Sequence, residues 1–206
     1  MTPIGKLIAL EGIDGCGKTT LAQSLGAALE RAGYAVLVTK QPGGTEFGKR
    51  VRTLIDETGG KIYPLAQFML FAADRVEHIE RVVKPALAAG TIVISDRLTD
   101  SSIAYQCYGY GVDREIVESV NRWTMGGVEP DCTLYVRIDP ALAAARVAQR
   151  GLAKTPFEKE GGAYTARVMR GFEDQCSRNS RCIPLDGSQS PESLLQAALQ
   201  ALRGVV

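Results

Sequence analysis

The chain has 206 residues, enough for one domain with a sizeable buried core. Hydrophobic residues make up 45% of it and charged residues 23%, which excludes wholesale disorder and collagen-like repetition. No apolar run reaches the roughly 18 residues that a membrane-spanning helix needs, so we expect no membrane partner. The net charge is +1, without the basic excess of a general nucleic-acid surface, so we expect no nucleic-acid partner and only local anion binding.

The five cysteines are scattered along the chain, and no two of them form a C-x-x-C pair. With His78 as the single histidine, the chain lacks the ligands of a usual Cys/His zinc site. We therefore expect reduced thiols in a cytoplasmic protein. The residues concerned are Cys16, Cys107, Cys132, Cys176 and Cys182.

Short apolar runs alternate with longer helical patterns from the N-terminus onward. Residues 7–10 predict a buried strand, which glycines separate from a helix over residues 18–32. Gly33 suits the position just beyond that helix. A second strand is predicted over residues 36–38 and a helical stretch over residues 45–57.

Pro64 opens a long helical pattern that runs toward Ala89. Because Pro85 lacks a backbone N–H, we expect it to end or kink this helix early. The predicted core stripe of the helix consists of Phe68, Ala72, Val76, Ile79 and Val83.

The second half of the chain continues the alternation of strands and helices. Three further strands are expected over residues 91–95, 134–138 and 182–185. Helices are expected over residues 115–125, 140–150, 163–180 and 192–202. Continuously apolar strands separated by helices predict a three-layer α/β fold, with a five-stranded parallel sheet covered on both faces. No Pro/Ser-rich linker divides the chain, so we expect a single domain over residues 1–206 with a short lid at about 150–162.

A glycine-rich segment between the first strand and the first helix, Gly12–Thr19, fits the pattern G-x-x-x-x-G-K-[ST]. Its glycines let backbone N–H groups point at phosphate oxygens, and the helix N-terminus adds its positive dipole end. Lys18 can reach the β- and γ-phosphates, and the Thr19 hydroxyl can ligate Mg²⁺. The alternative is a glycine-rich turn with an incidental lysine. The predicted nucleoside triphosphate site consists of Gly12, Ile13, Asp14, Gly15, Cys16, Gly17, Lys18 and Thr19.

Two uses of the triphosphate compete, a hydrolytic switch or motor and a kinase with a small acceptor. A guanine-specific switch would carry an [NT]-K-x-D segment, and none occurs in the sequence. The third strand ends in Asp96 followed by Arg97, where a motor usually has Asp or Asp-Glu. Asp96 can hold Mg²⁺ through water, and Arg97 adds a fork-shaped cation that suits two phosphorylated molecules, although a surface ion pair is the bland alternative. The pattern favours a kinase.

Four motifs together resemble the bacterial thymidylate kinases in their order and approximate spacing. They are G-I-D-G-C-G-K-T-T from Gly12, Q-P-G-G-T from Gln41, F-A-A-D-R from Phe71 and D-R-L-T-D-S-S-I-A-Y-Q from Asp96. The first indicates only a phosphate loop, whereas the last two together are family-specific. The resemblance implies a P-loop enzyme that uses ATP and Mg²⁺ to make dTDP from dTMP, as a cytoplasmic homodimer. Another nucleoside or nucleotide kinase of this fold and a regulatory ATPase remain the alternatives.

By this resemblance, Phe71 stacks on the thymine ring, and Arg75, one helical turn later, bonds the carbonyl edge of the base. The spacing of the two residues places both side chains on one helix face. The residues alone leave a second interpretation open, in which Phe71 belongs to the core and Arg75 pairs with Glu77 or Asp74.

The resemblance also places Ser102 and Gln106 at the base edge and Tyr105 against the sugar, where it would crowd a ribose 2′-OH. A tyrosine at this spacing is equally compatible with simple packing. Arg52 and Arg97 resemble the family's ligands of the acceptor phosphate, although Arg52 also suits a solvated helix face.

Three positions depart from the family pattern. Gln41 stands where Glu is common, Leu98 replaces an aromatic residue after Asp-Arg, and Pro156 stands at the position of the lid arginine. Asp14 keeps the family's acid, which holds the 3′-OH of the acceptor near the metal. The source of the lid cation is therefore the open question of the sequence.

Three basic residues near the lid can replace the missing arginine. Arg146 and Arg150 lie one helical turn apart at the end of a predicted helix, and Lys154 lies within the lid. Because arginine has a fork geometry and a permanent charge, we predict Arg150 as the catalytic cation, then Arg146, then Lys154. Alternatively, the arginines only complement the dipole at the helix C-terminus. The predicted catalytic set is Lys18, Asp14, Arg97 and Arg150.

Overall fold

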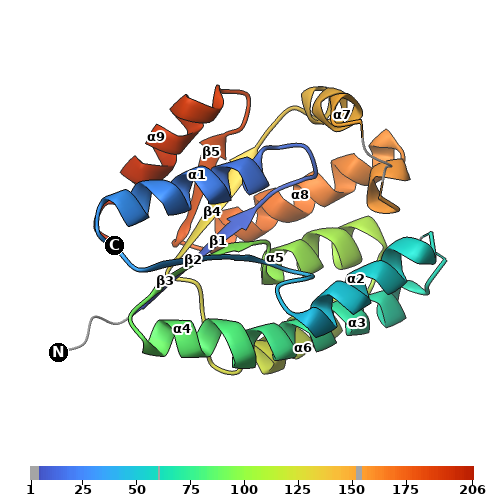
Figure 1. Cartoon of the computed structure of the whole chain (residues 1–206). Coiled ribbons are helices and arrows are strands. Elements are labelled where there is room, and N and C mark those ends of the chain that lie inside the picture. Colours follow the sequence, from blue (N-terminus) through green and yellow to red (C-terminus); the bar gives the residue numbers. More distant parts are fainter. Residues whose placement is uncertain (1–4, 60, 152–154) are drawn as a thin grey trace.

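The computed structural model describes residues 5–59, 61–151 and 155–206. Its centre is a sheet of five parallel strands in the order β2-β3-β1-β4-β5, as Figure 1 shows. The strands are β1 (Lys6–Glu11), β2 (Val36–Lys40), β3 (Ile92–Asp96), β4 (Cys132–Arg137) and β5 (Cys182–Asp186). The predicted α/β fold class and the five predicted strands are confirmed.

Helices connect the strands and cover both faces of the sheet (Figure 1). Between β1 and β3 lie α1 (Lys18–Arg31), α2 (Glu46–Glu57), α3 (Pro64–His78), the π-helical turn η1 (Ile79–Val83) and α4 (Lys84–Ala88). Between β3 and β4 lie α5 (Thr99–Ser102), the π-helical segment η2 (Ile103–Gly109) and α6 (Arg114–Met125). After β4 come α7 (Pro140–Gln149), the 3₁₀ turn η3 (Phe157–Lys159), α8 (Gly162–Arg178) and α9 (Pro191–Ala201). Across the described residues, no helix has both the length and the apolar character needed to cross a membrane.

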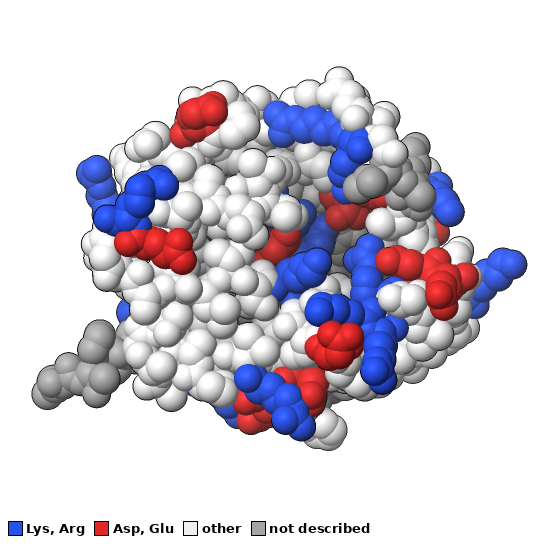
Figure 2. Space-filling view, viewed as in Figure 1, with Lys and Arg blue, Asp and Glu red and all other residues white. Residues whose placement is uncertain are grey.

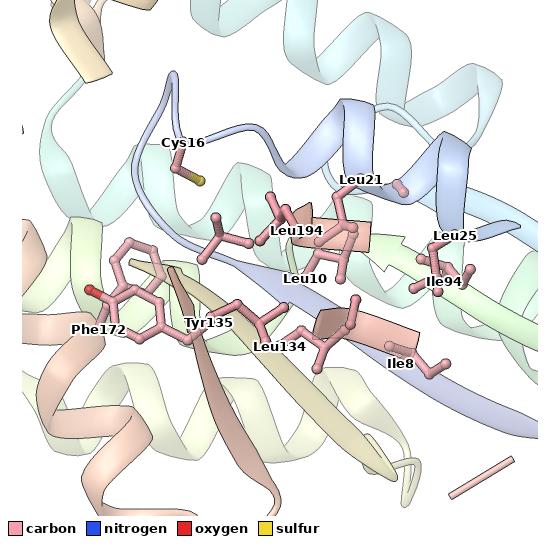
Figure 3. Packing of buried hydrophobic residues seen from close by; sticks show 14 of the residues in the cluster. Ile8, Leu10, Cys16, Leu21, Leu25, Ile94, Leu134, Tyr135, Phe172 and Leu194 are labelled. Carbon is pink, nitrogen blue, oxygen red and sulfur yellow. The ribbon is translucent and has the colours of Figure 1, made fainter. Parts of the chain in front are cut away.

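Alternate side chains along the strands fill a core on each face of the sheet. On one face, the central strands pack against α1 and α9, and Figure 3 shows part of this cluster. Its members include Ile8, Leu10, Leu21, Leu25, Ile94, Leu134 and Leu194. On the other face, Leu7, Ala9 and Val93 pack against Ile79 and Val83 of the long helix. Because burying one such side chain contributes roughly 1.5–3 kcal/mol, burial on both faces explains the continuously apolar strands.

The carboxyl ends of β1, β3 and β4 meet at one edge of the sheet, because all the strands run in the same direction. The central strand β1 pairs with β3 on one side and with β4 on the other. In open parallel sheets, ligands bind in the crevice outside such carboxyl ends. We therefore expect ligands to bind at the loops that follow Glu11 and Asp96.

The long helix that begins at Pro64 differs from its prediction at two points. It continues past Pro85 to Ala88, because the chain widens into η1 and Pro85 falls in the first turn of α4, where a missing N–H is tolerated. Val76, predicted in the core stripe, is 44% exposed. The neighbouring Arg75 takes the inward position and is 2% exposed.

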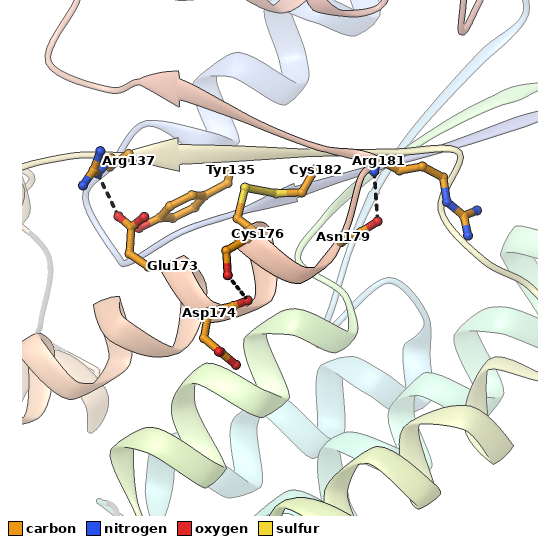
Figure 4. The surroundings of a disulfide bond; sticks show 9 residues. Tyr135, Arg137, Glu173, Asp174, Cys176, Asn179, Arg181 and Cys182 are labelled. Carbon is orange, nitrogen blue, oxygen red and sulfur yellow. Dashed lines mark hydrogen bonds and ion pairs between the residues drawn. A yellow bond between two sulfur atoms is a disulfide. The ribbon is translucent and has the colours of Figure 1, made fainter.

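The expectation of five reduced thiols is wrong for two cysteines, since Cys176 and Cys182 form a disulfide bond (Figure 4). The chain reverses between the last turn of α8 and the first residue of β5, where the Asn179 side chain accepts a hydrogen bond from the backbone N–H of Arg181. This reversal brings the two Cα atoms within 5.1 Å, a separation that a disulfide spans. The free cysteines are Cys16, Cys107 and Cys132.

Candidate active site

The loop between β1 and α1 wraps around the side chain of Lys18. The Lys18 Nζ donates hydrogen bonds to the backbone oxygens of Gly12 at 3.0 Å and Ile13 at 2.9 Å, and the side chain is buried. Gly12 has a φ of 141°, and a Cβ there would lie 2.6 Å from the Val136 carbonyl oxygen. Gly17 adopts the left-handed conformation just before α1. Close backbone packing therefore requires glycine at position 12, and the left-handed backbone favours it at position 17.

The eight predicted nucleotide-binding residues divide into two groups. The pocket beside the loop, called the phosphate-loop pocket here, is lined by Asp14, Gly15, Gly17, Lys18 and Thr19. The other three, Gly12, Ile13 and Cys16, are buried beneath it. The backbone carbonyls of Gly12 and Ile13 hold Lys18, and the Cys16 sulfur lies 3.5 Å from the Lys18 Nζ.

Two oxygen-bearing side chains meet at the edge of the phosphate-loop pocket. The Thr19 hydroxyl donates a hydrogen bond of 2.5 Å to the carboxylate of Asp96, the last residue of β3. Within the described residues, no cluster of three or more His, Cys, Asp or Glu side chains could hold a metal ion by itself. Hydroxyl and carboxylate oxygens suit Mg²⁺, which commonly binds through one or two such groups together with substrate phosphates. The donor set therefore fits the predicted metal.

Arg97 reaches from the end of β3 across the phosphate loop. It has a φ of 73°, an uncommon value for a residue with a side chain. Its guanidinium donates to the Gly12 oxygen at 2.8 Å, the Ser101 hydroxyl at 2.9 Å and the Tyr105 hydroxyl at 3.1 Å. It also forms an ion pair with Asp14. The unusual backbone aims this cation at the point where the loop and η2 meet.

Asp14 and Arg97 each stabilise the charged form of the other. Burial alone would raise the pKa of Asp14, but the charges of Arg97 and Lys18 hold it below its ordinary value. Burial would lower the pKa of Arg97, yet Tyr105, Asp14 and nearby acids raise it well above its ordinary value. Both groups therefore stay charged at neutral pH.

Glu11, which the sequence analysis missed, supports the turn that carries Arg97. Its carboxylate accepts hydrogen bonds from the Leu98 and Ser101 backbone N–H groups at 2.8 and 3.2 Å and from the Ser101 hydroxyl at 2.5 Å. Leu98 is 2% exposed, so the aliphatic replacement noted in the sequence lies within the fold. The signal that could have found Glu11 is an acid at the end of an otherwise apolar strand.

A second pocket, called the aromatic pocket here, opens beside Arg97 and contains about 510 Å³ of space, including the part open to solvent. Its wall brings together all the predicted acceptor-binding residues: Arg52, Phe71, Arg75, Arg97, Ser102, Tyr105 and Gln106. Phe71 is only partly buried and faces this pocket, so it is not a core residue.

Arg75 does not pair with the acids that the sequence offered. Its Nε donates to the Gln41 Oε1 at 3.1 Å, and its terminal nitrogens donate to Asn121 at 2.6 Å and Ser102 at 2.7 Å. Glu77 instead pairs with Arg81. Burial lowers the pKa of Arg75 to about 10, so it remains a cation.

The polar neighbours of Arg75 occupy the inner end of the aromatic pocket. Ser102 and Gln106 are 3% and 2% exposed, and the Gln106 amide lies 3.5 Å from Gln67. Tyr105 packs edge-on against Phe157 and Phe172, and burial raises the pKa of its hydroxyl. These residues come from α3, α5, η2 and η3, which converge from distant parts of the sequence.

The two pockets share one wall, because Asp14, Gln41, Pro42, Arg52 and Arg97 line both of them. Arg52 lies half-exposed at this junction, where its Nε donates to Asp56 at 2.8 Å. In Figure 2, Lys and Arg side chains gather with a few acidic ones around a hollow to the right of centre. The arrangement can hold two anionic molecules end to end.

Comparison with known proteins now decides the family. The thymidylate kinase family model matches residues 10–198. Over 202 residues, 97% of this chain and 96% of the relative, the chain is 39% identical to thymidylate kinase of Nostoc punctiforme. The chain belongs to the thymidylate kinase family. The enzyme of Gloeobacter violaceus is 40% identical over 197 residues, 95% of this chain and 93% of the relative.

A solved thymidylate kinase shares the fold. The crystal structure of the enzyme from Ehrlichia chaffeensis superposes with a TM-score of 0.81 at 29% identity, covering 97% of this chain and 100% of that one. The assignment of this chain to the thymidylate kinases, nucleoside monophosphate kinases that phosphorylate dTMP to dTDP, is thereby confirmed.

Two of the basic residues considered for the predicted lid lie at the C-terminal end of α7. Arg150 and Arg146 both line the phosphate-loop pocket. The Arg150 guanidinium donates to the Glu158 carboxylate at 2.7 Å, and Arg146 donates to the Gly187 oxygen at 2.7 Å. Lys154 lies outside the described residues. Two arginines, Arg146 and Arg150, therefore lie beside the phosphate loop, although Pro156 occupies the position where the family pattern has its arginine.

The turn η3 contributes an aromatic residue that the sequence analysis missed. Phe157 lines the aromatic pocket, with its ring centroid 6.2 Å from Phe71 and 5.5 Å from Tyr105. A large apolar residue within an otherwise charged loop was the signal that could have found it.

Proposed function

We propose that the chain transfers the γ-phosphoryl group of ATP to dTMP in a Mg²⁺-dependent reaction that gives dTDP and ADP. The observation that carries the proposal is the shared wall, where Asp14, Arg52 and Arg97 line both pockets. A phosphoryl group in transfer lies between donor and acceptor, and cations there compensate the charge on its oxygens.

The reaction needs positioning more than acid–base chemistry. An oxygen of the dTMP phosphate forms a bond to the γ-phosphorus as the bond to the β–γ bridging oxygen breaks. The attacking oxygen is largely deprotonated at neutral pH, because the second pKa of a phosphate monoester is about 6. No general base is therefore required.

The donor phosphates belong in the phosphate-loop pocket. Loop N–H groups and Lys18 bind them, and Arg97 and Arg150 stabilise the group in transfer. The Thr19 hydroxyl and the Asp96 carboxylate would hold Mg²⁺, which supplies further charge compensation when bound. The adjoining hollow, lined by Cys16, Thr20, Arg146 and Gln189 among others, would take the base of ATP.

The acceptor belongs in the aromatic pocket. Phe71 stacks on the thymine ring, Arg75 donates to a base carbonyl, and Ser102 and Gln106 complete the base edge. Tyr105 packs against the deoxyribose, while Arg52 and Arg97 bind the phosphate, and Asp14 holds the 3′-OH. This orientation places the dTMP phosphate at the shared wall.

We include three further features in the proposal. Residues 1–206 form a single domain in which about 150–162 act as a lid over the bound nucleotides. The enzyme works in the cytoplasm and binds no nucleic acid, in keeping with its net charge of +1.

The proposal also includes a homodimer. Met69 and Val76 on α3 and Ile116 and Trp123 on the adjacent α6 are exposed large apolar residues. A second copy of the chain would cover them. Sedimentation equilibrium should give twice the chain mass, and Trp123→Glu should shift it to the monomer; a wild-type monomer would contradict this part.

A substrate panel tests the reaction itself. ADP release should depend on both ATP and an acceptor, with dTMP preferred over dUMP, dCMP and thymidine, and EDTA should abolish it. Acceptor-independent ADP release would instead support the regulatory ATPase. Preference for dCMP or thymidine would support another kinase of the same fold.

A further inference from the structure

A largely buried series of hydrogen bonds runs from the aromatic pocket to the carboxyl end of the edge strand β2. It joins Arg75 to Gln41, Gln41 to His78, and His78 to Thr39 of β2. Gln41, Arg75 and His78 are 7%, 2% and 0% exposed. We propose that Gln41 and His78 are positioning residues that set base specificity by orienting Arg75. The inference rests on the proposed base-reading role of Arg75.

The direction of every bond in this chain follows from its first member. The Nε–H of an arginine can only donate, so the Gln41 atom 3.1 Å away is the carbonyl oxygen. The amide nitrogen of Gln41 then faces His78 Nδ1 at 2.9 Å and donates to it. His78 must therefore carry its proton on Nε2, which donates to the Thr39 hydroxyl at 2.7 Å.

His78 is held in this neutral form and in one ring position. Burial, with a contribution from the Arg75 charge, lowers the pKa of His78 to about 4. The ring packs so closely on Gly44 that a Cβ there would lie 2.7 Å from Nε2. The imidazole is thus a fixed acceptor for Gln41 at neutral pH.

The direct partners of Arg75 orient it without neutralising it. Its hydrogen-bond partners in the described part of the chain are the neutral side chains of Gln41, Asn121 and Ser102. Three of the five guanidinium N–H groups are used in this way, which leaves one on each terminal nitrogen. Glu11, Asp74 and Asp100 act on the charge only through space.

A fixed, charged donor discriminates between bases by their chemistry. The 4-position of thymine or uracil is a carbonyl that accepts from Arg75, whereas cytosine carries an amino group there and presents a second donor. A glutamate at position 41 would pair with Arg75 and favour a protonated His78. Gln41 carries no charge, so it orients Arg75 and leaves the remaining guanidinium N–H groups available to the base.

Kinetics of matched variants test the proposal. Gln41→Leu and His78→Leu should each raise the dTMP KM about tenfold and lower the dTMP-to-dCMP ratio of kcat/KM. Because Gln41 also lines the phosphate-loop pocket, His78→Leu is the variant in which the ATP KM should change less than about twofold. His78→Asn keeps an acceptor near Nδ1 and should restore most of the wild-type values. Thr133→Val, which removes a buried hydroxyl of β4 outside both pockets, is the control.

Arg75→Lys separates failure of the inference from failure of the proposed function. An unchanged dTMP KM in Arg75→Lys would overturn the role of Arg75 itself. If Arg75→Lys raises that KM while Gln41→Leu and His78→Leu keep wild-type values, the positioning role is wrong.

A spectroscopic measurement on the wild-type protein needs no variant to fold. His78 is the only histidine, so its imidazole ¹⁵N signals are unambiguous in the full chain. They should show a neutral ring protonated on Nε2 at about pH 7. A proton on Nδ1, or a charged imidazole at that pH, would overturn the proposed chain of hydrogen bonds.

Discussion

The two ends of the aromatic pocket are each built on an arginine, buried at the inner end and partly buried at the other, and the partners of the two arginines differ in charge. Arg97, at the junction with the phosphate loop, is ion-paired with Asp14 and has a raised pKa. Arg75, at the inner end, is bonded to neutral side chains, and burial lowers its pKa to about 10.

The difference matches the chemistry expected at each end. A phosphate is a full anion that binds a cation in competition with a resident carboxylate, and Asp14 keeps Arg97 charged and placed. A base carbonyl has only a partial charge, and the neutral partners of Arg75 leave it N–H groups that can donate to such a carbonyl. In the proposed function, the same residue type therefore serves catalysis at one end and recognition at the other.

Loss of charge at the phosphate end should have the largest effect. Lys18→Ala and Arg97→Ala should each lower kcat by about 10²–10³-fold or more, because both cations stabilise charge that develops during transfer. The measurement is kcat at saturating ATP and dTMP, with a melting temperature to confirm folding. Near-normal turnover in a folded Lys18→Ala protein would refute the phosphate-loop site.

Removal of the lid cation tests whether the phosphate end needs Arg150. Arg150→Ala should lower kcat by about 10²-fold or more, since a cation closing on the group in transfer carries a large part of the rate. Glu158→Gln breaks the 2.7 Å ion pair but keeps the arginine, so it should cost far less. Arg31→Ala, an exposed arginine at the end of α1, is the matched control. Equal kcat values in all three proteins would assign the role to another cation.

At the recognition end, Phe71→Ala should weaken dTMP binding by roughly 1–3 kcal/mol, the usual value of an aromatic stacking platform. ATP affinity should not change, because Phe71 lines only the aromatic pocket. Calorimetric titration with each nucleotide checks both values. A lowered melting temperature with unchanged dTMP affinity would make Phe71 a structural residue.

The smallest effect expected is a pH dependence of stability. The pKa of His78 is lowered from 6.5 to about 4, so the folded state binds fewer protons than the unfolded state between these values. Its contribution is complete above about pH 6.5 and should decline by about 2 kcal/mol on acidification to about pH 5. The measurement is urea unfolding at both pH values.

Asp74 has the opposite effect on the pH dependence of stability. Burial raises its pKa to about 6, so protonation on acidification removes the free-energy cost of burying its charge. Because Asp74 is present in both wild type and His78→Asn, its contribution cancels when the stability changes of the two proteins are subtracted. Wild type should lose more stability than the variant between about pH 7.5 and pH 5. Parallel losses in the two proteins would show that His78 does not titrate as described.

The sequence predicted the features that depend on contiguous residues. The five strands, the phosphate loop and the helices around it follow from apolar periodicity and glycine spacing. The segment α5–η2 was missed, because its first turn is Thr-Asp-Ser-Ser and its π-helical part has a different period.

The family resemblance predicted which distant residues share the aromatic pocket, but several other long-range contacts were not predicted. Arg75 meets Asn121, Gln41 meets His78, and Phe157 reaches the aromatic pocket, all through pairs distant in the chain. Val76 was misplaced because the inward position went to a charged neighbour with buried polar partners. The disulfide depends on a chain reversal that spacing alone does not reveal.

The most direct test of the division between the two arginines is the dTMP-to-dCMP ratio of kcat/KM, measured in wild type, Arg75→Lys and Arg97→Lys. The account predicts that Arg97→Lys lowers the rate for both acceptors and leaves the ratio unchanged, whereas Arg75→Lys lowers the ratio by about tenfold or more. Equal changes of the ratio in both variants, or a change only in Arg97→Lys, would contradict it.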